Sequence, residues 1–373
     1  MHKRRKRPLI LLVVLLAILA FFIFKTASFY PFLFQLAFNR GINLKQTSDS
    51  KINILLLGIG GGTHDGPNLT DTIIFASLDQ KNNKVTLISV PRDLWYPDLE
   101  DANKKINGVY ANGETKNVGT GLVEAEAAIK KVTGQEVNYG VRIDFSGFVK
   151  AVDTIGGLDI NVDNTFDDYA YPIDGMEDDS CGFSSQDIQA FVATDSAEQD
   201  IEAKFSCRYK HLHFDKGLQH MDGETALEYV RSRHATGVEG SDFARSKRQE
   251  KVINAFKDKL ISAQTLINPG KIIELYNILK GSIDTDIKQN DFDDFIRLAQ
   301  KMQKAKIQSA VLDTGDKETN RAGLLIEAPI SSDYNFLFVL IPRIGNGNFT
   351  EIQKYVTCEI TKGNCIVTQT AKD

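Results

Sequence analysis

Arginines and carboxylates gather in four short segments, at the predicted ends of strands and helices. A guanidinium group binds phosphate through two donors and keeps its charge at any biological pH. A carboxylate beside such arginines is explained by a divalent cation that bridges it to the same phosphate. The pattern therefore indicates a phosphate site, although solvated side chains and helix-supporting ion pairs remain the alternative for each segment taken alone. The segments are Leu69-Thr70-Asp71-Thr72, Ser89-Val90-Pro91-Arg92-Asp93, Tyr229-Val230-Arg231-Ser232-Arg233-His234 and Gly240-Ser241-Asp242-Phe243-Ala244-Arg245-Ser246-Lys247-Arg248-Gln249.

The fourth segment opens a predicted helix that runs from about residue 241 to 260. Asp242, Arg245 and Gln249 are three and four residues apart, so they share one side of that helix. The same side continues as an apolar stripe toward the core. A polar stripe that runs into an apolar one predicts that the start of the helix faces a cleft.

Several other chemistries lack their signatures. The glycine-rich stretch 58–62 is not a dinucleotide-binding loop, because Thr63 stands where the last glycine is required. It is not a Walker A loop either, since Pro67 follows Gly66 in place of a lysine. The chain has no G-x-S-x-G motif, which leaves a serine-hydrolase triad without an anchor.

Histidines and cysteines do not form a recognisable metal motif. The spacing of His211, His213 and His220 is loose for zinc and favours solvated or capping histidines, and no C-x-x-C pair occurs. The four cysteines instead suggest two local disulfides that close short loops. Four unpaired thiols are the alternative. The expected pairs are Cys181 with Cys207 and Cys358 with Cys365.

Charge is distributed unevenly along the 373 residues. The formal net charge is −5, and five basic residues lie within the first seven, so the rest of the chain carries −10. A general nucleic-acid binder needs a net basic surface, and this acidic body argues against nucleic acid as a partner.

The N-terminal region predicts a membrane anchor. An unbroken apolar run from Leu9 to Phe24 spans about 24 Å as a helix, and the aromatic stretch 27–38 extends it. A cleaved signal peptide is the alternative, but no clear cleavage site follows Phe24. Both interpretations place the chain beyond residue 38 outside the cytoplasm, because the basic residues before the apolar run stay on the cytoplasmic side. We therefore expect a single-pass cell-membrane protein, with residues 1–38 as basic tail and transmembrane helix and membrane lipid as a partner.

Hydrophobic patterns beyond a tether at 39–51 alternate between strands and helices. This alternation predicts an α/β fold, a three-layer α-β-α domain with a central mixed sheet over 52–357. Residues 163–211 read as an acidic, cysteine-containing surface insertion, and 358–373 as a C-terminal tail. Strands are expected at 52–57, 72–78, 84–90, 139–143, 158–162, 307–312 and 337–341, and helices at 121–132 and 145–155, from 222, at 241–260, from 268 and from 290.

A series of motifs resembles the LytR–CpsA–Psr family of bacterial cell-envelope proteins. The resemblance covers roughly residues 50 to 260, in family order, behind the N-terminal anchor usual in that family. The motifs are Ile54-Leu55-Leu56-Leu57-Gly58, Asp71-Thr72, Ser89-Val90-Pro91-Arg92-Asp93, Lys105-Ile106-Asn107, Tyr229-Val230-Arg231-Ser232-Arg233 and Asp242-Phe243-Ala244-Arg245-Ser246-Lys247-Arg248-Gln249.

The resemblance implies a phosphotransferase that attaches polyprenyl-diphosphate-linked glycopolymer to a peptidoglycan acceptor through a phosphodiester. It implies a sheet between helix layers with an apolar tunnel, and Mg²⁺ or Mn²⁺ held by Asp71. The diphosphate would be bound by Arg92, Arg231, Arg233 and Arg245, with Gln249 in support, Lys105 near the lipid-linked substrate and Arg248 as a further substrate contact.

The sequence departs from the family pattern at two positions. Leu69 stands where family members commonly have an arginine, two residues before Asp71-Thr72. The chain has Ile59-Gly60-Gly61 where the family usually has an aspartate, which makes Asp65 the nearest replacement as second metal ligand, with Asp93 as another. Asp93 or Asp242 is expected as general base, unless a metal-bound oxygen suffices. A polyprenyl-diphosphate hydrolase and a non-enzymatic envelope regulator or scaffold are the competing functions.

Overall fold

The computed structural model describes residues 41–62, 66–101, 103–176, 178–194, 204–261, 277, 282–316 and 321–368. The chain divides into two compact units. The larger unit combines Lys45–Ile287 with Met302–Asp373, and it contains the central sheet and the site described below. The smaller combines Met1–Leu44 with Lys288–Lys301, where η3 (Gln289–Asp291) and α12 (Phe292–Lys301) agree with a helix expected from residue 290.

The predicted membrane anchor at 1–38 lies outside the described residues. Within the described ranges, no helix combines the length and the apolar character needed to cross a membrane. The helix expected from residue 268 also falls outside the described residues.

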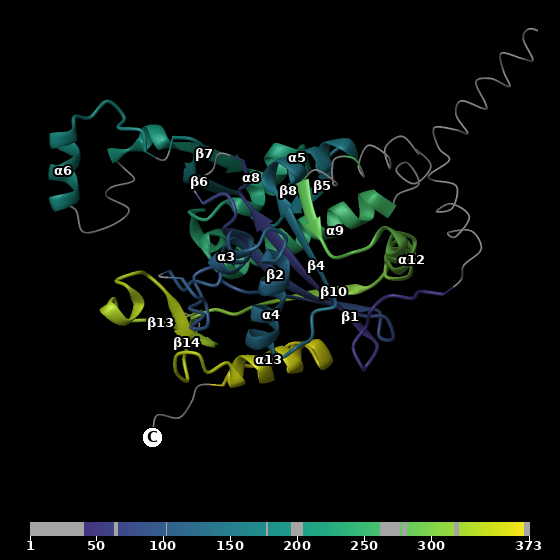
Figure 1. Ribbon diagram of the computed structural model, residues 1–373. Coiled ribbons are helices and arrows are strands. Elements are labelled where there is room, and N and C mark those ends of the chain that lie inside the picture. Colours follow the sequence, from purple (N-terminus) through teal and green to yellow (C-terminus); the bar gives the residue numbers. More distant parts are fainter. Residues whose placement is uncertain are drawn as a thin grey trace, which may run out of the picture. The chain divides into compact units, whose positions relative to one another are not determined.

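A six-stranded mixed sheet forms the centre of the larger unit (Figure 1). The sheet combines parallel pairs, β1–β4 and β3–β10, with antiparallel pairs, β1–β2, β2–β3 and β4–β9. The predicted α/β class with a mixed central sheet is thus confirmed. In spatial order the strands are β10 (Lys306–Val311), β3 (Lys84–Ser89), β2 (Thr70–Asp79), β1 (Lys51–Ile59), β4 (Tyr139–Asp144) and β9 (Ile283–Thr285).

The helices of the larger unit follow the expected ranges closely, with three additions. α3, α6 and α13 were not expected, whereas α4, α5, α8 and α9 agree with the predictions within a few residues. The helices are α3 (Gly108–Lys116), α4 (Gly121–Thr133), α5 (Phe145–Thr154), α6 (Ser185–Thr194), α8 (Gly223–Arg231), α9 (Asp242–Ile261) and α13 (Thr350–Thr361).

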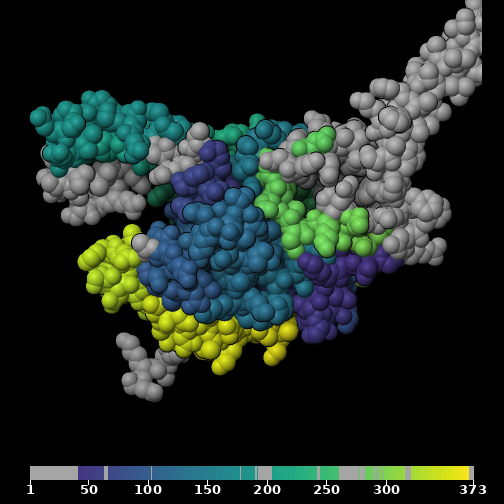
Figure 2. Space-filling view, in the orientation of Figure 1, coloured from purple at the N-terminus to yellow at the C-terminus, as the bar shows by residue number. Residues whose placement is uncertain are grey.

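β1 is largely apolar because helices cover both faces of the sheet. Leu55 and Leu57 pack into a core cluster with residues of α4 and α13. Ile54 and Leu56 point to the other face, where their cluster includes Ile253 of α9. Since successive side chains of a strand point to opposite faces, the sheet lies between helices, as the layered prediction expects. Figure 2 shows part of this arrangement, with the yellow C-terminal helix beside the blue α4 segment that it contacts.

Two antiparallel strand pairs form a second core with α5 and α8. β5 (Leu158–Val162) pairs with β8 (Gly217–Met221), and β6 (Phe166–Pro172) pairs with β7 (Tyr209–Phe214). The expectation of a surface insertion at 163–211 is therefore wrong for β6 and for the start of β7. Phe166 and Tyr171 of β6 are buried in this core, and the strand register shifts between Asp168 and Tyr171.

Both disulfides join the cysteines that the sequence analysis pairs, Cys181 with Cys207 and Cys358 with Cys365. Cys358 lies within α13, and Ile352, Val356 and Ile360 of that helix belong to the main core. The expected boundary between the domain and a tail at 358 therefore falls inside a packed helix.

Short elements complete the described part of the larger unit. The late strand expected at 337–341 begins only at Leu340. The elements are η1 (Ser206–Arg208), η2 (Gly237–Gly240), β11 (Gly315–Asp316), β12 (Arg321–Ala322), β13 (Leu325–Glu327), η4 (Ser332–Tyr334) and β14 (Leu340–Pro342).

Candidate functional site

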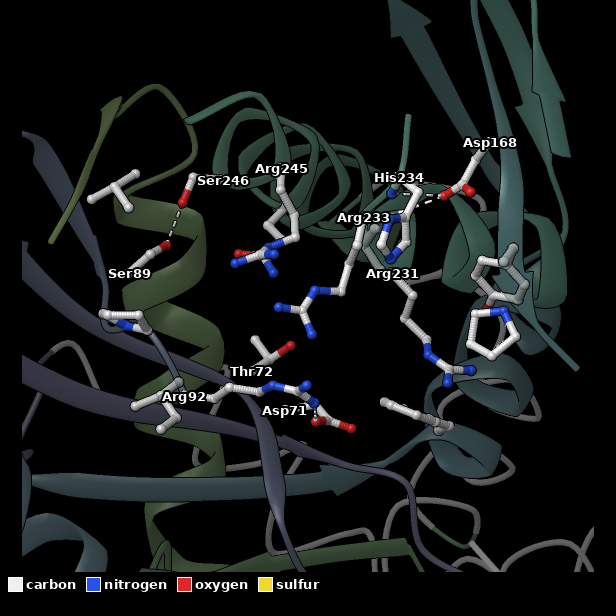
Figure 3. Close-up of a pocket in the computed structure, with 18 of the residues that line it drawn as sticks. Asp71, Thr72, Ser89, Arg92, Asp168, Arg231, Arg233, His234, Arg245 and Ser246 are labelled. Carbon is white, nitrogen blue, oxygen red and sulfur yellow. Dashed lines mark hydrogen bonds and ion pairs between the residues drawn. The ribbon is translucent and has the colours of Figure 1, made fainter. Parts of the chain in front are cut away.

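A cavity of about 320 Å³ opens at one edge of the central sheet and is lined mainly by polar side chains from distant parts of the chain. We call it the arginine cavity. Six residues singled out from the sequence line it together: Asp71, Arg92, Arg231, Arg233, Arg245 and Gln249. Figure 3 shows the side chains of Arg92, Arg233 and Arg245 reaching toward a common space, with Asp71 at its border.

The pairing of β2 with β3 brings Asp71 and Arg92 together. β2 starts at Thr70, β3 ends at Ser89, and these two ends share one edge because the strands are antiparallel. Pro91 follows the end of β3, and Arg92 then turns back so that its Nη1 donates to Asp71 Oδ1 at 2.5 Å.

Arg92 has two acidic neighbours. Burial lowers the pKa of Arg92, but the charges of Asp71 and Asp93 and the hydrogen bond to Asp71 outweigh it, and the net pKa is raised. The Nε atom is buried, has no hydrogen-bond partner in the described part of the chain and lies 3.6 Å from Asp93 Oδ2. Arg92 therefore enters any reaction as a cation with donor capacity left for an anion.

The end of α8 presents two further arginines. The helix ends at Arg231, and Ser232 leaves the helical conformation with φ −50° and ψ 125°. This break allows Arg231 and Arg233, which are two residues apart, to reach the same cavity. In a continuing helix their side chains would point in different directions.

Asp168 of β6 holds this turn in place. It is fully buried, and its Oδ2 accepts hydrogen bonds from Ser232 Oγ at 2.7 Å and from the backbone N–H groups of Arg233 and His234 at 3.2 Å each. Its Oδ1 accepts from the backbone N–H of Ala170 at 3.0 Å. The dashed lines of Figure 3 mark contacts of Asp168 with this turn. The sequence analysis did not single out Asp168 because it lies in the stretch expected to be an insertion.

Arg248 supports the same turn from below and does not line the cavity. It is only 2% exposed and donates to the backbone oxygens of Tyr229, Ser232 and Glu239 at 2.7–2.9 Å. A further bond joins it to Glu239 Oε2 at 3.1 Å. The expectation that Arg248 contacts substrate is therefore wrong, because its N–H groups donate to buried protein oxygens.

α9 contributes one wall of the cavity. Arg245, Ser246 and Gln249 line it, and the hydroxyl of Ser246 hydrogen-bonds to that of Ser89, which ties the helix to the end of β3. The expected cleft at the start of this helix is thus present. Asp242 is the first residue of α9, and its side chain lies outside what the structure describes, so its role as general base stays a prediction.

Aromatic rings hold Arg231 from two sides. Its guanidinium lies 4.2 Å from the ring centre of Phe145 and 5.4 Å from that of Tyr171. Tyr171 lines the cavity, and its hydroxyl is buried without a hydrogen-bond partner among the described residues. Burial raises the pKa of Tyr171, so the hydroxyl stays protonated and can donate to an anion. Phe166 and Tyr171 are the apolar positions that mark β6 in the sequence, but no local pattern distinguishes Asp168 from the acidic residues around it.

Asp93 and Lys105 form a separate ion pair beside the cavity. Lys105 Nζ lies 2.7 Å from Asp93 Oδ1, and neither residue belongs to the cavity lining. Because the Asp93 carboxylate is occupied by Lys105 and Arg92, this placement argues against Asp93 as general base. It also leaves the expected contact of Lys105 with substrate without structural support.

Of the two carboxylates in the described lining, only one is available as a metal ligand. Asp168 is buried and saturated by donors, whereas Asp71 is 37% exposed, next to Thr72. Mg²⁺ keeps several waters and uses one or two carboxylates together with substrate phosphates, so Asp71 fits such an ion. Asp65, the expected second ligand, lies outside the described residues.

Charge in the lining is predominantly positive. Four guanidinium groups face the two carboxylates of Asp71 and Asp168, which gives a formal charge of +2. Arginine forks around a partly enclosed cavity define a site for an anion with several oxygens, such as phosphate.

Comparison with known proteins assigns this α/β protein with its arginine-lined cavity to a family. The chain belongs to the LytR_cpsA_psr family, whose model matches residues 35–328. It is 26% identical over 226 residues to "Polyisoprenyl-teichoic acid--peptidoglycan teichoic acid transferase TagV" of Bacillus subtilis, covering 60% of this chain and 47% of that protein. It is 27% identical over 254 residues to TagU of Bacillus cereus, which has the same functional name, covering 67% and 65%.

A solved structure agrees with the fold. The crystal structure of Bacillus subtilis TagV matches with a TM-score of 0.51 and 21% identity, covering 84% of this chain and 98% of that one. In sequence, the chain spans about half to two thirds of the length of these two relatives.

Proposed function

We propose that this protein transfers a polyprenyl-diphosphate-linked glycopolymer to peptidoglycan and joins the two by a phosphodiester. The convergence of Arg92, Arg231, Arg233 and Arg245 with Asp71 on one cavity carries this proposal. Family membership and the functional names of TagU and TagV support a transferase of teichoic acid or a related polymer.

The chemistry follows from the charges of the cavity. A hydroxyl of the acceptor glycan attacks the phosphorus next to the glycopolymer and gives up its proton, the P–O–P bond breaks, and polyprenyl phosphate leaves and takes up that proton. Negative charge grows on the non-bridging and leaving oxygens during this step. The fixed guanidinium groups stabilise that charge without reorganisation, in a site partly shielded from water.

Each side chain has a distinct part in this proposal. Arg92 and Arg245 stand on opposite walls and clamp the diphosphate, while Arg231 is held by its aromatic neighbours against one end of the cavity. The neutral hydroxyl of Tyr171 adds a donor that does not repel the guanidinium groups. A Mg²⁺ or Mn²⁺ ion held by Asp71 would supply further neutralisation of the phosphate oxygens.

The proposed location is the outer surface of the cell membrane. The apolar run 9–24 would anchor the chain where its lipid-linked donor is confined, which raises the local concentration of that donor. Two disulfides in the described body support a compartment outside the reducing cytoplasm.

The test is transfer of a labelled polymer from its lipid carrier to a peptidoglycan fragment by the purified full-length chain in detergent. We expect Mg²⁺-dependent transfer that Arg233→Ala abolishes and Arg321→Ala leaves unchanged. Arg321 is the matched control, since it lies outside the cavity lining and pairs with Asp313. Release of free polymer without any transfer would identify a hydrolase, and absence of turnover in the wild type would favour a binding scaffold.

A further inference from the structure

The outer face of the β6–β7 hairpin carries a group of side chains that the proposed function does not use. Asp167 of β6 stands directly opposite His213 of β7 in the strand register. His211 lies two residues before His213, so both imidazoles project from the same face of β7. The group therefore belongs to two paired strands, which hold side chains more rigidly than loops do.

Two ring nitrogens converge on one carboxylate oxygen in this group. His211 Nε2 lies 2.7 Å and His213 Nδ1 lies 2.8 Å from Asp167 Oδ1. These three atoms lie within 4.8 Å of one another, and none of the three side chains belongs to the lining of the arginine cavity. We propose that Asp167, His211 and His213 bind a Zn²⁺ ion on the outer face of the hairpin.

The chemistry of the donors favours zinc over the cation expected in the arginine cavity. Zn²⁺ takes imidazole nitrogens and carboxylate oxygens at about 2.0–2.2 Å, which places tetrahedral ligands about 3.3 Å apart. A shift of about half an ångström from the present hydrogen-bond distances opens that space. Mg²⁺ prefers an all-oxygen octahedron and has little affinity for a pair of imidazoles.

Further contacts orient both imidazoles. The ring of His211 stacks on Tyr169, with ring centres 4.3 Å apart and planes within 5°. The second ring nitrogen of His213, Nε2, lies 3.3 Å from Asp215 Oδ1. A carboxylate that holds the remote nitrogen of a ligating histidine is the usual outer support of a zinc site. Asp215 thus leaves Nδ1 of His213 directed at the metal position.

The site has three protein ligands and an open fourth position. His211 and His213 side chains are 48% and 47% exposed, so water can complete the coordination. Backbone hydrogen bonds also link the proposed zinc site to the turn that carries Arg233. The N–H of Thr236 donates to the backbone oxygen of Asp167 at 2.8 Å, and the next residue of β6 is Asp168, which holds the turn with Arg233.

The test is direct zinc binding and is independent of the transfer reaction. The full-length chain in detergent is stripped with a chelator, titrated with Zn²⁺ at pH 7.5 in competition with a chromophoric chelator, and analysed for metal after gel filtration. We expect one zinc per chain that His211→Ala and His213→Ala each abolish and that millimolar Mg²⁺ does not displace. We expect Asp215→Asn to keep the stoichiometry and weaken affinity about 10–100-fold.

His220 provides the matched control. It is also an exposed strand histidine, and its Nδ1 lies 2.8 Å from Asp159 Oδ1, but no second histidine shares that carboxylate among the described residues. His220→Ala should bind zinc as the wild type does. Asp167→Asn guards against a folding defect, because its amide oxygen can still accept from the histidines but is a poor zinc ligand.

Two results would overturn the site. One is a wild-type chain that retains no zinc at micromolar concentrations. The other is a zinc stoichiometry that stays the same in the His211, His213 and Asp167 variants, which would place the ion elsewhere. In either case the three side chains would be only an ion-pair cluster.

Discussion

Replacement of Asp168 by alanine should destabilise the protein and disorganise the arginine cavity together. The carboxylate accepts four hydrogen bonds, and three of them fix residues 232–234. A hydrogen bond to a charged group contributes about 1.5–3 kcal/mol, and buried donors left without acceptors add a similar penalty. Because neighbouring bonds are not additive, we expect a loss of about 3–6 kcal/mol in the free energy of unfolding. That loss is a large part of the ~5–15 kcal/mol typical of folded domains.

Asparagine at the same position separates stability from function. Asp168→Asn keeps the volume and one acceptor but loses the charge and at least one of the four bonds. We expect a smaller loss of stability and a transfer rate at least about 10-fold lower, since a shift of about 1 Å in a positioned group can cost about 100-fold.

The assays are urea unfolding followed by circular dichroism, and polymer transfer at a temperature where each variant is folded. Asp167→Asn is the matched control, because the neighbouring side chain points to the outer face of the hairpin and should leave transfer unchanged in zinc-free buffer. Wild-type stability and transfer in Asp168→Asn would refute the role of this carboxylate in holding the turn.

Three further predictions concern single side chains. Arg92→Ala should lower the transfer rate about 10²–10³-fold while the unfolding curve stays near that of the wild type. Arg92→Lys should restore only part of the rate, because an ammonium group lacks the two parallel donors of a guanidinium. Equal transfer rates for Arg92→Ala and the wild type would show that Arg92 does not bind the diphosphate. Arg248→Ala should cost about 3–5 kcal/mol in urea unfolding because it leaves the carboxylate of Glu239 buried without its cation, and an unchanged midpoint would contradict this. Burial, followed by the charge of Asp286, raises the pKa of Glu126 to about 7 from 4.5. The contribution of this group to the free energy of unfolding is therefore fully present below pH 4.5 and is lost as pH rises through 7, by up to about 3 kcal/mol. Urea unfolding between pH 4.5 and 8 should show this fall in stability, and Glu126→Gln should make stability nearly independent of pH over that range.

The sequence identifies the sheet and the cavity residues for a common reason. Apolar runs such as 54–57 form strands that are covered on both faces, and the polar residues at or just beyond the ends of such strands meet at one edge of the sheet. Asp71 and Arg92 follow this rule, and Arg245 and Gln249 follow helical spacing. These local patterns survive folding, so the amino-acid sequence points to these four of the residues that line the arginine cavity.

The remaining site residues depend on contacts that local patterns do not contain. Arg248 lies three residues after Arg245 and therefore on nearly the same side of α9. Its guanidinium is instead held inward by Glu239 and by the backbone oxygens of Tyr229 and Ser232. Asp168 is one of several acidic residues in its stretch, and only the pairing of β6 with β7 distinguishes it from the outward-facing Asp167. α3 contains two glycines, and its stability comes from packing against α4, which helix propensity does not register.

The formal charge of +2 in the cavity lining has a consequence for inhibitors. A diester of diphosphoric acid carries two negative charges, which match this surplus when no metal ion is bound to Asp71. Chloride or a monoanionic phosphodiester supplies only one charge and leaves the walls repelling one another. Ordinary buffer salts should therefore be weak competitors, and inorganic pyrophosphate or a bisphosphonate is the natural starting scaffold for a small-molecule blocker.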